Sequence, residues 1–179
     1  MNVSVRQFRQ DDIVQTISDI LRDTGLEARY LEIELTESAV MHDADQFIAM
    51  LNELNDLGVQ ISIDDFGTGY SSLSYLKRFP VDRLKVDRSF VHDIANDIDD
   101  AIIVRTVIAL GHNLGLKVVA EGVETQQQLE FLRANRCDEL QGYYFGVPLP
   151  GNEFIEVLRR DEPLRELPPS PKRAQLPLL

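Results

Sequence analysis

Charged and amide side chains stand at or beside the ends of short segments rich in β-branched residues. Glu34 closes one such segment, and the pair Asp64 and Asp65 follows the next one along the chain. The feature recurs at Lys85 and Asp87, at Glu121 and Glu124, and at Gln141. When parallel strands close into a barrel, residues from the carboxyl ends of several strands form the active site at one mouth. The pattern therefore indicates a site.

The chemistry of that site follows from its charge. Lys85 is the one cation among these strand-end residues, set against the carboxylates of Glu34, Asp64, Asp65, Asp87 and Glu121. Carboxylates gathered in a low-dielectric site repel one another unless cations or protons compensate. Oxygen ligands suit Mg²⁺ or Mn²⁺, an adjacent aspartate pair can bridge two ions, and two such ions are typical of displacement at a phosphoryl centre. The three histidines lack the spacing of a zinc site.

A simpler interpretation exists for each acidic residue taken alone. An aspartate or glutamate at a strand end often caps the helix that follows it. Recurrence across five segments favours a site over five separate caps.

The elements that position these residues alternate along the chain. Strands are expected over 30–35, 59–63, 83–86, 117–120 and 139–145, and helices over 13–21, 47–54, 103–114, 126–132 and 154–158. Gly58 and Gly115 provide stops, and Thr125 with Gln128 forms a capping box. This alternation predicts an α/β fold with a parallel sheet. Gly67-Thr68-Gly69 does not complete a dinucleotide-binding fingerprint, which favours a barrel over a doubly wound sheet.

Composition limits the partners. The chain has 179 residues, 18 Lys+Arg against 30 Asp+Glu and a net charge of −12, which disfavours nucleic acid and anionic membrane surfaces. The lone Cys137 cannot form an intramolecular disulfide, and no secretory leader opens the chain, so we expect a cytoplasmic protein. The proline-rich segment 161–179 is expected to be a flexible tail after one domain over 1–160.

Five stretches together resemble the EAL domain of bacterial cyclic di-GMP phosphodiesterases. They are Glu34-Leu35-Thr36-Glu37, the run from Asp64 to Leu73, the run from Leu84 to Phe90, the run from Ala120 to Thr125, and Gln141-Gly142-Tyr143-Tyr144-Phe145. The resemblance covers residues 2 to about 158 and implies a TIM-type (β/α)₈ barrel. It implies metal-dependent hydrolysis of one phosphodiester bond of cyclic di-GMP, which gives the linear dinucleotide pGpG.

The resemblance also implies a role for each matching residue. Asn2, Glu34 and Asp64 match ligands of one ion, and Asp64, Asp65 and Glu121 match ligands of a second. Lys85 matches the lysine that holds the attacking water, Gln141 and Pro148 match the substrate pocket, and Asp87 and Glu124 match supporting acids. Glu37 matches a glutamate that braces the loop over 66–73, and a homodimer through segment 66–80 is implied.

The chain departs from the family pattern in two places. Gly146-Val147 stands where many members have a basic residue before the proline, and the Glu-Ala-Leu signature does not occur. A complete barrel needs about 250 residues, so the resemblance implies an N-terminally truncated barrel of about six βα units. An internal codon read as the start at Met1 would explain this.

Three functions remain open at this stage. The first is a phosphodiesterase whose activity is impaired by truncation. The second is a non-catalytic module for cyclic di-GMP binding or dimerisation, which would not need Asp64, Asp65, Glu121 and Lys85 together. The third is an inert remnant, which would be poorly soluble and would not be stabilised by ligand.

Overall fold

A parallel β-sheet forms the centre of the molecule. The computed structural model describes residues 1–3, 7, 12–42, 44–69 and 73–159. Within them the sheet has five strands in the order β1-β2-β3-β4-β5, all parallel. Their bounds are β1 Glu32–Thr36, β2 Gln60–Phe66, β3 Arg83–Val86, β4 Lys117–Ala120 and β5 Glu139–Leu140. Asn2 adds an isolated parallel bridge to Glu34, beside β1.

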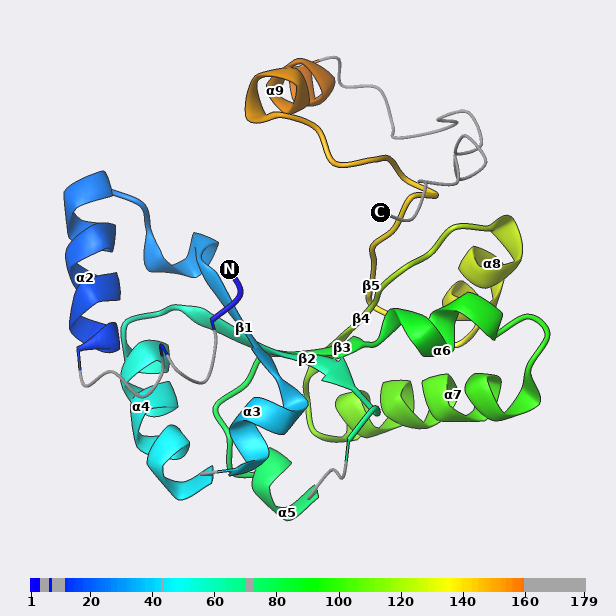
Figure 1. The fold of residues 1–179 in the computed structure, drawn as a ribbon, viewed down its shortest axis with the longest axis horizontal. Coiled ribbons are helices and arrows are strands. Elements are labelled where there is room, and N and C mark those ends of the chain that lie inside the picture. Colours follow the sequence, from blue (N-terminus) through cyan, green and yellow to red (C-terminus); the bar gives the residue numbers. More distant parts are fainter. Residues whose placement is uncertain (4–6, 8–11, 43, 70–72, 160–179) are drawn as a thin grey trace, which may run out of the picture.

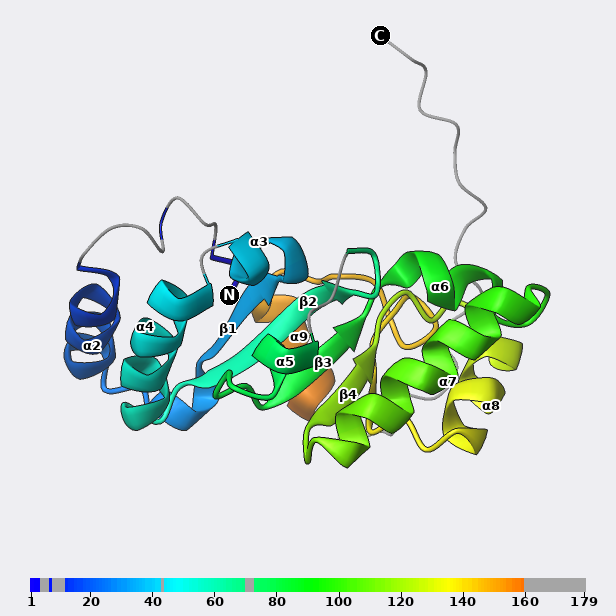
Figure 2. The ribbon, with the colours of Figure 1, turned by 90° about the horizontal axis from the view of Figure 1, so that it is seen from below.

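Helices connect each strand to the next, and further helices precede the first strand and follow the last. They are α2 Ile13–Thr24, the 3₁₀ turn η1 Ala28–Tyr30, α3 Glu37–His42, α4 Ala44–Asp56, α5 Leu73–Leu76, α6 Arg88–Asp93, α7 Ile98–Asn113, α8 Gln126–Ala134 and α9 Gly151–Arg159. Figures 1 and 2 show α3, α4, α5 and α7 on one face of the sheet and α9 on the opposite side. No helix in the described part of the chain is long and apolar enough to cross a membrane.

The two faces of the sheet differ because side chains alternate along each strand. Ile61, Ile63, Leu84 and Val86 are fully buried and belong to the hydrophobic core. Polar side chains occupy the alternate positions, namely Glu32 and Glu34 in β1, Gln60, Ser62 and Asp64 in β2, and Arg83 and Lys85 in β3. The polar face therefore carries charged groups from neighbouring strands at similar heights.

Arg83 connects several strands at the amino ends of the sheet. Its Nη1 donates hydrogen bonds to Glu32 Oε2 (3.0 Å) and Gln60 Oε1 (2.6 Å), and its Nε lies 3.5 Å from Glu139 Oε1. Its side chain is 12% exposed, so this guanidinium is largely withdrawn from water and paired with carboxylates from β1 and β5. Arg83 and Lys85 are two residues apart, so their side chains lie on the same face of β3.

Most of the predicted elements are confirmed. The strands over 83–86 and 117–120 have the predicted bounds, the capping box of Thr125 and Gln128 is present, and the predicted stops Gly58 and Gly115 have positive φ (87° and 74°). The α/β prediction is confirmed by the parallel sheet. The predicted tail over 161–179 lies outside the described residues.

The predicted strand over 139–145 is wrong beyond Leu140. The chain turns after Gln141, where the Tyr144 N–H donates to Val123 O (2.8 Å) and the Phe145 N–H donates to Gly142 O (3.1 Å). These bonds satisfy the backbone without a ladder. None of residues 141–145 is buried, and Tyr143 is 53% exposed, so the aromatic residues here do not extend the buried sheet.

Candidate active site

The Lys85 ammonium is the centre of the candidate site. Its Nζ lies 2.6 Å from Glu121 Oε1, 3.2 Å from Glu34 Oε1 and 3.3 Å from Asp64 Oδ1. The lysine comes from β3, and the three carboxylates come from β1, from β2 and from the residue directly after β4. Four neighbouring segments of the sheet thus meet at one cation, as expected where parallel strands end together.

The charges of this cluster are partly withdrawn from water. The side chain of Lys85 is 6% exposed, and those of Asp64, Glu121 and Glu34 are 15%, 20% and 22% exposed. Burial by itself acts to lower the pKa of Lys85, but the hydrogen bond to Glu121 and the surrounding negative charges outweigh it and raise the pKa. The lysine is therefore a fixed cation that can donate hydrogen bonds.

A second group of carboxylates lies at the ends of β2 and β3. Asp65 has a left-handed backbone (φ 54°), and its N–H donates to Asp64 Oδ1 (3.0 Å). Burial, then the charge of Asp64, then a hydrogen bond with Asp87 raise the pKa of Asp65. Asp87 also caps α6, because its Oδ1 accepts from the Ser89 N–H (2.9 Å). These contacts leave the mouth of the site with more negative than positive charge.

Glu37 supports the segment after β2. It is 1% exposed, and its Oε2 accepts a hydrogen bond from the Gly67 N–H (3.0 Å). Gly67 has φ +100°, and a Cβ there would lie 3.1 Å from the ring of Phe90 in α6. The buried carboxylate and the close packing together hold the chain directly after Asp64 and Asp65. The bracing role expected for Glu37 stays a prediction.

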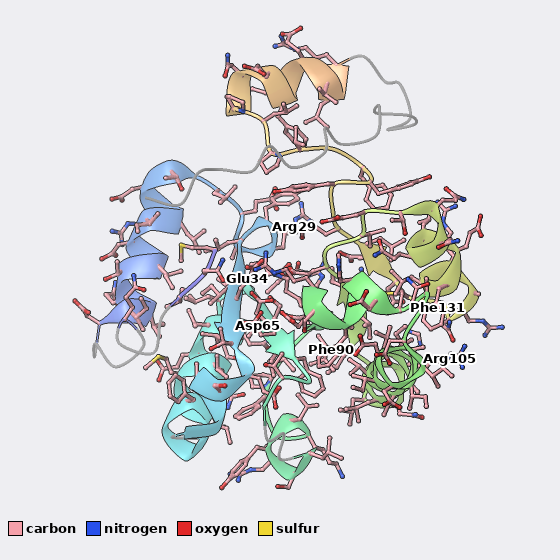
Figure 3. All side chains as sticks on the ribbon, turned by 45° about the vertical axis from the view of Figure 1, so that its right-hand side comes forward. Arg29, Glu34, Asp65, Phe90, Arg105 and Phe131 are labelled. Carbon is pink, nitrogen blue, oxygen red and sulfur yellow. The ribbon has the colours of Figure 1, made fainter. Side chains whose placement is uncertain are left out.

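The segment after β4 is held from both sides. Gly122 has φ +75°, and a Cβ there would lie 2.7 Å from Arg88 Cβ at the start of α6. The Val123 N–H donates to Gln141 O (3.0 Å), which joins this segment to the end of β5. Both contacts hold the backbone directly after Glu121. Figure 3 shows Glu34 and Asp65 near the middle of the sheet, whereas Arg105 and Phe131 lie on the outer helices.

The structure does not join every expected site residue to the cluster. Asn2 lies beside Glu34 through its backbone bridge. Gln141 and Pro148 are exposed, as is Glu124, whose N–H donates to Gln128 Oε1 (2.7 Å). Within the described residues, no hydrogen bond or ion pair links the side chains of Gln141, Pro148 or Glu124 to Lys85. Their expected roles stay predictions.

The donor set fits hard divalent ions, although the side chains point at Lys85. Across the described part of the chain, no three His, Cys, Asp or Glu side chains are arranged to hold a metal ion as they stand. Glu34, Asp64 and Glu121 instead share the ammonium. All available ligands are oxygens. The same carboxylates would hold Mg²⁺ or Mn²⁺ after a reorientation of their side chains.

A family model for the EAL domain matches residues 1–148. The chain belongs to the EAL domain family. Among its relatives in Pseudomonas aeruginosa, the cyclic di-GMP phosphodiesterase NbdA is 49% identical over 172 residues, which are 93% of this chain and 22% of NbdA. The bifunctional diguanylate cyclase/cyclic di-GMP phosphodiesterase MucR is 48% identical over 155 residues, covering 87% of this chain and 23% of MucR. The EAL chain thus spans about a fifth of the length of these curated relatives.

Solved structures agree on the fold of this EAL chain. A cyclic di-GMP complex of the MucR phosphodiesterase superposes with a TM-score of 0.83 at 49% identity, covering 86% of this chain and 62% of that one. The EAL domain of Mycobacterium smegmatis DcpA gives 0.83 at 43% identity, covering 89% and 71%. Klebsiella pneumoniae BlrP1 with manganese and cyclic di-GMP gives 0.76 at 38% identity, covering 83% and 38%. The predicted α/β fold of the EAL family is confirmed, with five strands in the described residues where about six βα units were expected.

Sequence reasoning missed two polar contacts around the site. The Ser89 hydroxyl and the Ser89 N–H both donate hydrogen bonds to Asp87 Oδ1. The Asp-Arg-Ser sequence, typical of a helix N-terminal cap, could have indicated these two bonds. Gln128 was visible only as half of a capping box. Its side chain also donates to His92 O (2.9 Å), a contact between segments 36 residues apart that no local pattern reveals.

Proposed function

We propose that this EAL chain hydrolyses cyclic di-GMP to linear pGpG in a divalent-metal-dependent reaction. The observation that carries the proposal is the Lys85 ammonium, held by carboxylates from three neighbouring segments of the sheet. Relatives named as cyclic di-GMP phosphodiesterases, and solved relatives in complex with cyclic di-GMP, support this substrate. Manganese and calcium complexes of BlrP1 support a divalent cofactor.

Each group of site residues has a separate role in the proposed reaction. Glu34, Asp64, Asp65 and Glu121, with the Asn2 amide, would hold two Mg²⁺ or Mn²⁺ ions, which supply the positive charge that attracts and polarises the phosphodiester. Lys85 donates hydrogen bonds from its ammonium and orients the attacking water in line with the scissile P–O bond. A neighbouring carboxylate accepts the water proton, and the leaving ribose oxygen takes up a proton from solvent. Asp87, Glu37 and Glu124 keep the surrounding segments in place, and Gln141 and Pro148 contact substrate.

The assay is hydrolysis of cyclic di-GMP by the purified chain with Mg²⁺ or Mn²⁺, read as pGpG by chromatography. The decisive variant is Asp64→Asn, which keeps the volume of the side chain and removes its charge. Asp56→Asn is the matched control, because Asp56 is exposed at the end of α4. Turnover in the unaltered chain and in Asp56→Asn, lost in Asp64→Asn and in excess EDTA, would support the proposal. Equal turnover in the two variants would contradict it.

A second candidate is a non-catalytic module that binds cyclic di-GMP. It is favoured by one observation, that no three His, Cys, Asp or Glu side chains in the described part of the chain are arranged to hold a metal ion as they stand. Saturable binding of cyclic di-GMP without pGpG formation in either metal would establish it. Homodimerisation through segment 66–80 and a cytoplasmic location belong to both candidates, and sedimentation of the purified chain tests the dimer.

A further inference from the structure

Gln128 is a buried polar residue outside the set expected to bind metal or substrate. It is 3% exposed, and the other buried polar or charged residues in the described part of the chain are Glu37, Ser62 and Lys85. A buried amide needs partners for both its donor and its acceptor atoms. The partners of Gln128 connect two segments that border the site.

The side chain of Gln128 makes hydrogen bonds in two directions. Its Oε1 accepts from the N–H groups of Glu124 (2.7 Å) and Thr125 (2.9 Å). Its Nε2 donates to His92 O near the end of α6 (2.9 Å). Because donors lie on one side and an acceptor on the other, the orientation of this amide is fixed by its surroundings.

The bond to His92 is more than a helix cap requires. A capping box is closed equally well by glutamate or glutamine at the third helical position. Only glutamine carries an N–H that can donate to a carbonyl on the opposite side. The second bond therefore joins the segment after β4 to the helix that follows β3.

That segment carries Glu121 directly after β4 and Glu124 just before α8. The Glu121 N–H donates to Val86 O (3.3 Å), the Val123 N–H donates to Gln141 O (3.0 Å), and Gly122 packs against Arg88. Gln128 adds a connection to the far end of α6. We infer that Gln128 is a positioning residue that fixes the segment after β4 so that Glu121 meets Lys85. This inference rests on the proposed function.

The test uses a substitution that separates the cap from the connection. Gln128→Glu keeps an oxygen for the Glu124 and Thr125 N–H groups but sets a carboxylate oxygen against the His92 carbonyl. Gln127→Glu is the matched control, because Gln127 is exposed in the same helical turn and undergoes the same change of charge. Gln128→Met, similar in size and without charge, removes all three bonds and serves if Gln128→Glu does not fold.

Two measurements read the result. Turnover per folded molecule is expected to fall about 10–100-fold in both Gln128 variants, as for other residues that orient metal ligands, with KM for cyclic di-GMP unchanged. Backbone amide exchange is expected to be faster over 121–125 in these variants than in Gln127→Glu, while exchange in α7 is unchanged. A purely structural cap would lower the melting temperature without this split between kcat and KM.

The outcomes separate this inference from the proposed function. If the unaltered chain shows no turnover, the phosphodiesterase proposal fails, and the exchange measurement alone decides the role of Gln128. Faster exchange over 121–125 would then support the positioning of this segment. Turnover and exchange equal to those of Gln127→Glu in both Gln128 variants would overturn the inference.

Discussion

Replacement of Lys85 by methionine tests the electrostatic account of the site. The substitution keeps most of the side-chain length and removes the ammonium that lies 2.6, 3.2 and 3.3 Å from three carboxylates. At an effective dielectric of about 20, each pair corresponds to roughly 5–6 kcal/mol of gross attraction. Much of this offsets the cost of withdrawing the charges from water.

The net effect is expected to be a loss of about 3–5 kcal/mol in the free energy of unfolding, as for other buried ion pairs that lose one partner. This is a large part of the roughly 5–15 kcal/mol that stabilises a typical domain. The loss should shrink as the pH is lowered from 7.5 to 5, because three close carboxylates without a cation take up protons. Urea unfolding in EDTA, followed by circular dichroism, measures it.

Lys117→Met provides the comparison. Lys117 lies in β4 and pairs with Glu139 at 3.4 Å, but its side chain is 61% exposed, so its loss should change stability by at most about 1 kcal/mol. If Lys85→Met and Lys117→Met unfold at the same urea concentration at pH 7.5, the carboxylates do not depend on the ammonium. The electrostatic reasoning would then be refuted.

Three further predictions concern groups outside the Lys85 cluster. Gly122→Ala should lower the free energy of unfolding by about 1–3 kcal/mol, because φ is +75° and the new Cβ would lie 2.7 Å from a side-chain carbon of α6; Gly25→Ala, with φ +69° and nothing within 4 Å, should cost less in the same urea titration. Burial acts to raise the pKa of Asp138, but the hydrogen bonds from the Val118 N–H and from His112, together with the charges of His112 and Lys117, outweigh it and lower the pKa. The carboxylate therefore stabilises the fold above about pH 4 and loses this effect as the pH falls further. The difference in free energy of unfolding between the unaltered chain and Asp138→Asn should vanish in acid. A difference that stays constant with pH would contradict this prediction. Burial raises the pKa of Cys137 to about 11, so at pH 8 iodoacetamide should label the native thiol about a hundredfold more slowly than the urea-unfolded thiol, and equal rates would show the thiol to be accessible.

Most of the sheet and much of the candidate site can be predicted from the sequence. Alternating strand and helix segments predict the parallel sheet. The positions of polar residues at strand ends predict that Glu34, Asp64, Lys85 and Glu121 lie near one another. Such a prediction works because parallel strands end at one edge. The bounds of β3 and β4 follow from short runs of branched residues that a charged residue begins or interrupts.

Other features depend on contacts that are distant in sequence. The convergence of three carboxylates on Lys85 depends on side-chain orientation, which spacing alone does not fix. Helices of four to six residues, such as α3, α5 and α6, are too short to show a helical period. The early end of β5 follows from bonds to Val123 and Gly142, and the connection of Gln128 to His92 follows from the packing of α8 beside α6.

The order of the strands has a consequence for how the molecule folds. Each strand pairs with the strand that precedes or follows it in sequence, so no pairing has to await a distant part of the chain. Paired residues lie 20–34 positions apart in sequence, so each βα unit can add to the unit already in place. The sheet therefore resembles a linear array in which stability accumulates between neighbours. A destabilising substitution in β1 or β5, at the ends of the array, should weaken fewer strand pairings than an equivalent substitution in β3.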